Sequence, residues 1–221
     1  MPAEVETDAA HPRAIYKLCR REHNIALGCE TLRIGNMTYY HQFEDADIGD
    51  SQEGVKSGVD SEIFGYEVKI HRMAPFNLMF CAASANLAKF AEYDSCYVIT
   101  DAELFGRLIA RELAFQMAPR DIQTYAPIVT LTDVYDVDVA FRSGEVRYIP
   151  AQSATEDDHS SGEIPFWKSI AYQHQQEFRY VFHFYDEHRL PAFSSCTRSY
   201  IDLDISHLYG VLPVRPSEPG E

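Results

Sequence analysis

The segment Gln175-Gln-Glu-Phe-Arg-Tyr-Val-Phe-His-Phe-Tyr185 decides the fold, because a polar run opens directly into alternating aromatic residues. In an extended chain one face takes Phe178, Tyr180, Phe182 and Phe184, and the other takes Arg179, Val181, His183 and Tyr185. This period of two predicts a β-strand with one buried face and places Glu177 at its mouth. Glu177, Arg179 and Gln175 share the second face, an arrangement suited to charge-stabilising chemistry and equally typical of a solvated ion pair.

The composition is that of one aromatic-rich globular domain. The chain has 221 residues, of which 46% are hydrophobic and 13% aromatic, with 14 Tyr and 13 Phe. This length and composition favour a folded single domain. We expect it to span residues 13–213, between polar, proline-containing flexible tails at residues 1–12 and 214–221.

Short strands dominate the predicted elements. Strand patterns occur at 14–19, 31–34, 63–72, 77–84, 95–100, 128–131, 133–141, 146–149 and 200–204, with residues 142–145 predicted as a hairpin turn. The clearest helix follows Thr100 or Asp101 as N-cap and carries an apolar stripe from Leu104 through Phe115 to Met117. Helical turns are expected at 21–29, at 167–175 and after Ser84. The fold class predicted is α+β, with mixed, mostly antiparallel sheets flanked by a few helices.

The formal net charge of -15 restricts the classes of partner. It argues against nucleic-acid binding by bulk attraction, which needs clustered Lys and Arg. Residues 39–58 are rich in Asp, Glu and Gly and predict a long surface loop that does not fit a calcium-binding EF-hand. The acidic residues on the 133–145 segment, which a metal-dependent nuclease would need, alternate with apolar ones as on a solvated strand.

Motifs of several enzyme classes are missing from the sequence. The nine histidines form no zinc pattern, and there is no P-loop, G-x-S-x-G or G-x-G-x-x-G. Five cysteines without a C-x-x-C pair suggest a reducing compartment, and no apolar run reaches the ~18 residues of a membrane span. We therefore expect a cytoplasmic protein without a metal. Cys19, followed by Arg20 and Arg21, is the thiol expected to have a lowered pKa.

Three motifs in one order carry a resemblance. They are Ile15-Tyr16-Lys17, Phe80-Cys-Ala-Ala-Ser84 followed by Phe90-Ala-Glu-Tyr93, and Tyr172-x-x-x-Gln-Glu-Phe-Arg179. The set resembles a poorly characterised bacterial domain family with Leu-Tyr-Lys, Phe-Cys-x-Ser and Glu-x-Glu-Trp-Arg motifs. More weakly, it is similar to the ADP-ribosyltransferase superfamily, whose last motif would correspond to Gln175-x-Glu177.

The second resemblance implies an ADP-ribosyltransferase-like fold and an enzyme that consumes NAD. Such an enzyme transfers ADP-ribose to a macromolecular target or hydrolyses NAD, as a bacterial or phage conflict effector does. The implied catalytic residues are Glu177, which stabilises the ribosyl cation, and Gln175, which orients the nucleophile. The implied cofactor-binding residues are Tyr16, Lys17, Ser84, Tyr93 and Arg179, with Tyr40 as an alternative to Tyr93 for stacking on nicotinamide.

Each of these residues also has a simpler interpretation. Ser84 would cap a helix, Tyr93 would pack in the core and Lys17 would be a surface charge. Glu177 and Arg179 would form an exposed pair worth under ~1 kcal/mol. The alternative function is a non-enzymatic acidic binding or inhibitor protein that occupies a basic partner as a nucleic-acid mimic.

Overall fold

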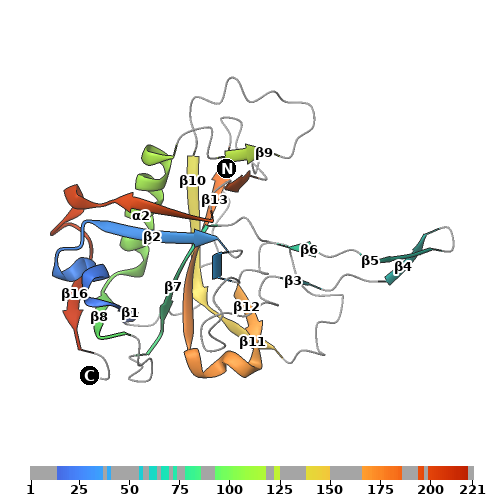
Figure 1. Cartoon of the computed structure of the whole chain (residues 1–221), viewed down its shortest axis with the longest axis horizontal. Helices are drawn as coiled ribbons and strands as arrows, with labels where there is room; N and C mark the ends of the chain where they lie inside the picture. Colours follow the sequence, from blue (N-terminus) through green and yellow to red (C-terminus); the bar gives the residue numbers. More distant parts are fainter. Residues whose placement is uncertain are drawn as a thin grey trace, which may run out of the picture.

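An eight-stranded sheet organises the chain, which forms a single α+β domain with mostly antiparallel strands and few helices (Figure 1). The computed structural model describes residues 14–36, 39–40, 55–56, 60–63, 66–69, 72–73, 78–85, 93–117, 122–124, 138–149, 166–185, 194–196 and 199–218. The strands of the main sheet are β1 (Ile15–Cys19), β2 (Thr31–Asn36), β7 (Leu78–Ala83), β8 (Ser95–Ile99), β10 (Asp138–Glu145), β13 (Glu177–Tyr185), β15 (Tyr200–Asp204) and β16 (Val214–Ser217).

The sheet forks at β7. Its main path runs β10-β13-β7-β1-β8-β16, and a side branch carries β2 and β15. The first residues of β7, Leu78 and Met79, pair with β2, whereas its last residue, Ala83, pairs with β1. The opposite edge of β7 pairs with β13 from Leu78 to Ala83. The strand predicted from the aromatic alternation is therefore an interior strand, between β7 and β10.

Four smaller strand pairs complete the described strands. The pair that bears on the site is β11 (Arg147–Ile149) with β12 (Trp167–Ser169), which run parallel. The others are β3 (Val55–Lys56) with β6 (Arg72–Met73), β4 (Asp60–Ile63) with β5 (Tyr66–Lys69), and β9 (Ile122–Thr124) with β14 (Ser194–Cys196).

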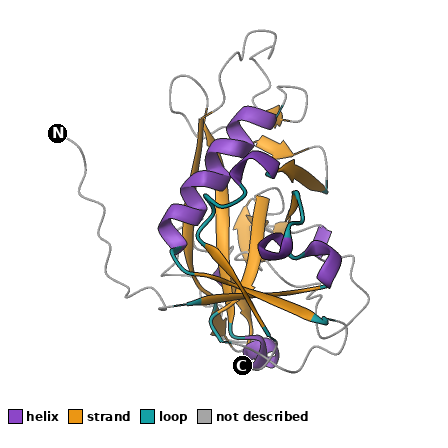
Figure 2. Ribbon diagram, turned by 90° about the vertical axis from the view of Figure 1, so that its left-hand side faces the viewer, coloured by secondary structure: helices purple, strands orange, loops and turns teal. Residues whose placement is uncertain are grey.

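The long helix α2 (Ala102–Gln116) covers one face of the sheet (Figure 2). As predicted, Asp101 caps it, because its carboxylate accepts a hydrogen bond from the backbone N–H of Leu104 at 2.9 Å. Gly106 lets the helix approach β10 closely, since a Cβ at this position would lie 2.2 Å from the Phe141 ring. The apolar stripe is narrower than expected, because Phe115 is 85% exposed.

Short 3-10 helices link the strands: η1 (Arg21–His23), η2 (Ile25–Leu27), η6 (Ile170–Gln175) and η7 (Ser206–Leu208). The turn predicted at 21–29 is confirmed, and Gly28 ends it with a φ of 99°, a left-handed conformation that favours glycine.

The two faces of β13 enter different clusters. Phe178, Tyr180 and Phe182 join the main core under α2, which confirms the predicted alternation. The expectation of a single buried face is wrong, because Val181 packs with Met79 and Phe166 in a second cluster behind the sheet. A strand covered on both sides has no solvated face on which Arg179 can lie.

Several predicted boundaries need correction. The hairpin at 142–145 does not form: β10 continues to Glu145 along β13, and β11 pairs with β12 instead. The 63–72 segment is not one strand, since Asp60–Ile63 and Tyr66–Lys69 pair with each other. Residues 214–217, assigned to the C-terminal tail, form β16 and pair with β8. The predictions for residues 1–12, 86–92 and 128–131, and for most of the 39–58 loop, lie outside the described residues.

Candidate functional site

Glu177 and Arg179 form a buried ion pair at the start of β13. Their exposed fractions are 7% and 0%. Arg179 donates from Nε to Oε1 at 2.7 Å and from Nη2 to Oε2 at 3.0 Å, so that it holds the carboxylate with two bonds. Such two-point pairing fixes the carboxylate plane. The sequence-based alternative of an exposed pair is wrong, because β7 and the layer behind β13 cover both side chains.

The turn before β13 sets the position of Glu177. Gln176 is the C-cap of η6, and its φ of 43° lies in the left-handed region that non-glycine residues seldom adopt. Its carbonyl accepts hydrogen bonds from the Ser84 backbone N–H at 2.7 Å and from Ser84 Oγ at 3.1 Å. Ser84 therefore secures the residue next to Glu177, rather than the carboxylate itself.

Lys168, on β12, is a residue of the site that the sequence analysis missed. It is 4% exposed, and its ammonium donates to Glu177 Oε2 at 3.0 Å. The same ammonium lies 5.1 Å from the centre of the Tyr172 ring, within cation–π range. Burial by itself would lower the pKa of Lys168, yet the adjacent Glu177 carboxylate raises it above its usual value. Lys168 is therefore a protonated partner of Glu177.

Tyr148, on β11, contacts the cluster through its hydroxyl. That oxygen accepts a hydrogen bond from the backbone N–H of Glu177 at 2.7 Å. In the parallel pair, Tyr148 lies opposite Lys168. Burial raises the pKa of Tyr148 to about 12, so its hydroxyl is protonated at neutral pH.

Cys81 and Tyr40 lie next in this layer. The pKa of the Cys81 thiol is raised well above its usual value by burial and by the nearby Glu177 carboxylate. Tyr40 donates from its hydroxyl to the Met79 carbonyl at 3.3 Å, and burial raises its pKa as well. Both groups therefore remain protonated at neutral pH. We name the set of Cys81, Tyr148, Lys168, Glu177 and Arg179 the Glu177 cluster.

The predicted residues of β1 take different positions. Tyr16 is half-buried and lies opposite Ala83, which is also opposite Glu177, so the three form one row across β1, β7 and β13. Strands are ~4.8 Å apart, which places the Cα atoms of Tyr16 and Glu177 roughly 10 Å apart. Lys17 instead donates to the Cys81 carbonyl at 2.7 Å, with its ammonium 4.9 Å from the Phe80 ring centre. Lys17 thus reaches the backbone of β7.

Gln175 and Tyr93 are the remaining predicted residues of the site. Gln175 is 8% exposed and ends η6, two residues before the carboxylate. Tyr93 is half-buried and lies two residues before the start of β8.

Burial raises the pKa of Cys19 to about 12, which makes the expected lowered pKa wrong. In the described ranges, His, Cys, Asp and Glu side chains form no group of three or more able to hold a metal ion.

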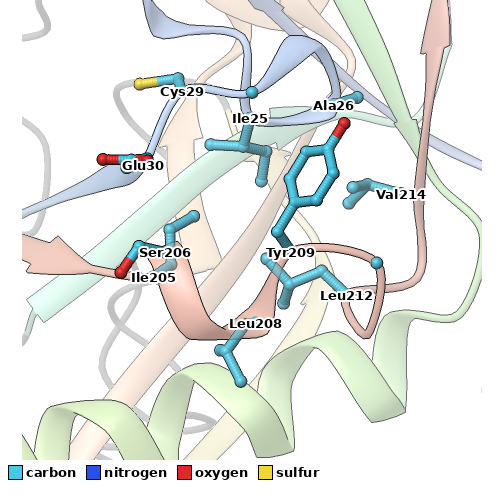
Figure 3. A pocket seen from close by; sticks show the side chains of 12 residues that line it. Ile25, Ala26, Cys29, Glu30, Ile205, Ser206, Leu208, Tyr209, Leu212 and Val214 are labelled. Atoms are coloured by element: carbon cyan, nitrogen blue, oxygen red, sulfur yellow. The ribbon is translucent and has the colours of Figure 1, made fainter.

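A cavity of about 430 Å³ lies elsewhere, between η2, η7 and the start of β16 (Figure 3). Polar and apolar atoms contribute almost equally to its walls. The Tyr209 ring lies between Ile25 and Val214, with its hydroxyl toward Ala26 (Figure 3). None of the predicted site residues lines it; the lining is Ile25, Ala26, Gly28, Cys29, Glu30, Ile205, Ser206, Leu208, Tyr209, Gly210, Leu212 and Val214.

Comparisons with known proteins returned no match: no protein-family model fits the chain, and no curated protein or solved structure is significantly similar to it. Over the part of the chain that the structure covers, no helix combines the length and the apolar character needed to cross a membrane.

Proposed function

We propose that the chain is an enzyme that consumes NAD, by ADP-ribosyl transfer to a macromolecular target or by hydrolysis, and that the Glu177 cluster is its active site. The observation that carries the proposal is a buried carboxylate at the end of an interior strand, held in one orientation by Arg179 and Lys168. A fixed carboxylate in a site shielded from water is the arrangement that stabilises a developing positive charge.

The reaction has one bond broken and one formed. The bond between the ribose C1 atom and the nicotinamide nitrogen breaks, and nicotinamide leaves with the electron pair. Water or a side chain of the target then forms a bond to C1 and loses a proton. The ribose is oxocarbenium-like in between, the same electrostatic demand that glycosidases meet with Asp or Glu. Glu177 supplies that negative charge, and Gln175 orients the nucleophile.

The contacts of Arg179 and Lys168 with Glu177 determine the roles that we propose for these two residues. Arg179 holds the carboxylate directly, so we propose it as a positioning residue instead of a cofactor-binding one. Lys168 offsets the charge of Glu177, which weakens the stabilisation of a cation. We propose that Tyr16, in the row of Glu177, contacts the ribose or nicotinamide.

The test measures release of nicotinamide from labelled NAD and labelling of proteins in a cell lysate. We expect the wild type to release nicotinamide and Glu177→Gln to do so about 100-fold more slowly, the usual effect of removing one charge-stabilising group. Labelled lysate protein indicates transfer, and release without labelling indicates hydrolysis. Equal release by wild type and Glu177→Gln, with nothing labelled, would refute the proposal.

Glu112→Gln is the matched control. Glu112 is also a buried carboxylate, 3% exposed, but it lies on α2, on the opposite face of the sheet. It should retain the wild-type rate. Assays are run at a temperature where circular dichroism shows all three proteins folded, so that loss of the carboxylate is separated from loss of the fold.

The alternative, a non-enzymatic acidic protein that occupies a basic partner, has one observation in its favour. The chain carries a net charge of -15, while Glu177 is neutralised by its own neighbours. Such a protein would capture a basic partner in a salt-sensitive way, and capture would survive Glu177→Gln. A yield that does not change between low and high salt would count against this alternative.

A further inference from the structure

The Tyr148 hydroxyl has a hydrogen bond to give that no described residue accepts. A phenol oxygen both donates one hydrogen bond and accepts others. Here it accepts from the Glu177 backbone N–H at 2.7 Å, which leaves its own hydrogen atom for another acceptor. Within the described ranges that acceptor is not the Glu177 carboxylate, which takes its hydrogen bonds from Arg179 and Lys168.

The position of Tyr148 suits contact with a ligand. Lys168 and Glu177 are buried, whereas Tyr148 is half-buried, so it is the more accessible of the three. Its strand, β11, is fixed at this point by pairing with β12, where Tyr148 lies opposite Lys168. The donor is therefore held on regular structure next to Glu177.

The Glu177 carboxylate and the Tyr148 phenol together favour a sugar hydroxyl as the ligand group. A sugar hydroxyl donates and accepts at once, so it pairs with a carboxylate acceptor and a phenol donor together. Because the phenol pKa is about 12, the hydrogen atom stays on Tyr148 at neutral pH.

We infer that Tyr148 donates a hydrogen bond to the ribose hydroxyl next to the carbon at which NAD is cleaved, and so binds the substrate beside Glu177. This inference rests on the proposed function, which places that ribose at Glu177. It adds a residue outside the motifs on which the resemblance to known families is built. Tyr148 touches the substrate in this arrangement, and Arg179 acts on it only through Glu177.

The test is a thermodynamic cycle on binding. The affinity for ADP-ribose and for its analogue lacking that ribose hydroxyl is measured with wild type and Tyr148→Phe, by titration calorimetry. Loss of the tyrosine hydroxyl should weaken binding about fivefold, the usual worth of one neutral hydrogen bond. Loss of the ribose hydroxyl should weaken binding more, because its hydrogen bond to the Glu177 carboxylate is lost as well. Combined, the two changes should cost little more than loss of the ribose hydroxyl alone, because that loss already removes the bond to Tyr148.

Two results would overturn the inference. One is wild-type binding of ADP-ribose and the analogue with equal affinity, which needs no variant and so holds even when Tyr148→Phe fails to fold. The other is a cycle in which the fold-losses in affinity caused by the two changes multiply, as they do when the two hydroxyls do not interact. Tyr97→Phe is the control, since it removes a buried phenol on β8, in the core under α2, and should leave the affinity unchanged.

Nicotinamide release, measured on the same preparations, separates this inference from the proposed function. If the two hydroxyls are coupled in binding but no nicotinamide is released, Tyr148 remains a ribose-binding residue and the proposed reaction is rejected. If nicotinamide is released but the two hydroxyls are not coupled, the reaction stands and the role of Tyr148 is rejected. A wild type that neither binds ADP-ribose nor releases nicotinamide rejects both.

Discussion

Replacing Glu177 with glutamine should destabilise the fold as well as slow the proposed reaction. The change leaves the ammonium of Lys168 and the guanidinium of Arg179 buried without the carboxylate that both contact. Removing one partner of a buried ion pair costs about 3–5 kcal/mol. The glutamine amide oxygen still accepts one hydrogen bond, so we expect the lower end, about 3 kcal/mol. For a single domain of this length, each kcal/mol lowers Tm by roughly 2–4 °C, which gives about 6–12 °C.

Urea and thermal unfolding, followed by circular dichroism, measure this effect against Glu112→Gln. Glu112 is buried too, but its partners Arg111 and His207 are 65% and 54% exposed. Losing Glu112 leaves those two side chains in water, so that variant should lose under about 1 kcal/mol. A Glu177→Gln protein that is no less stable than Glu112→Gln would refute the reasoning, because the cluster would then behave as a solvated ion pair.

Alkaline pH provides a second measurement on the same pair. The folded pKa of Lys168 lies above its unfolded value, which is ~10.4 for lysine. The contribution of Lys168 is therefore complete below pH ~10.4 and is lost as the pH rises through the folded pKa. Glu177→Gln removes the carboxylate that raises the pKa, so the alkaline loss of stability should be smaller in the variant. An equal loss would show that Glu177 does not set the pKa of Lys168.

Three further outcomes follow from the packing. Gly106→Ala should cost about 1–2 kcal/mol in urea unfolding, because its Cβ would lie 2.2 Å from the Phe141 ring; a more stable variant would contradict this. Burial lowers the pKa of His183, so stability should fall as the pH drops below ~6.5, where the unfolded chain takes up the proton. His183→Gln should reduce the difference in unfolding free energy between pH 7 and pH 5, and an unchanged difference counts against it. Burial raises the pKa of Cys19 to about 12 and of Cys96 to about 11, so both should resist a thiol reagent at pH 8 until urea is added.

The aromatic alternation of β13 was sufficient to predict the strand, its core face and the position of Glu177. Local pattern determines these features, because side chains on a strand alternate strictly. The Asp101 cap and the strands near residues 15, 95 and 200 are local as well, and the structure confirms them.

The burial of Glu177 and Arg179 was not predictable in the same way. It depends on what covers the second face of β13, and in the sequence a Glu-x-Arg on a strand is compatible with either environment. Lys168 lies nine residues before Glu177, and it reaches the carboxylate only because β12 pairs with β11 and η6 returns the chain to β13. No motif in the sequence marks that return. A lysine directly after the single Trp is the one signal, and it is a weak one.

The failed hairpin at 142–145 has a physical reason of the same kind. Ser143 and Gly144 favour a turn locally, yet β10 pairs with β13 over eight consecutive residues, Asp138 to Glu145. The hydrogen bonds of that ladder outweigh the local preference. Val146 then donates its N–H to the Glu177 carbonyl, which brings Tyr148 to the site. The turn that the sequence suggested would have taken Tyr148 away from Glu177.

The energetics of the Glu177 cluster bear on whether it is structural or functional. Buried ion pairs are seldom the most stable solution, because apolar residues of similar volume often fold as well or better. Val181, on the same face of β13, shows that an apolar side chain fits this layer. A cluster in which three charged side chains are each under 10% exposed is therefore poorly explained by stability alone. Its geometry, a carboxylate held from two sides beside a phenol whose hydrogen atom has no acceptor among the described residues, is better explained as a site prepared for a ligand.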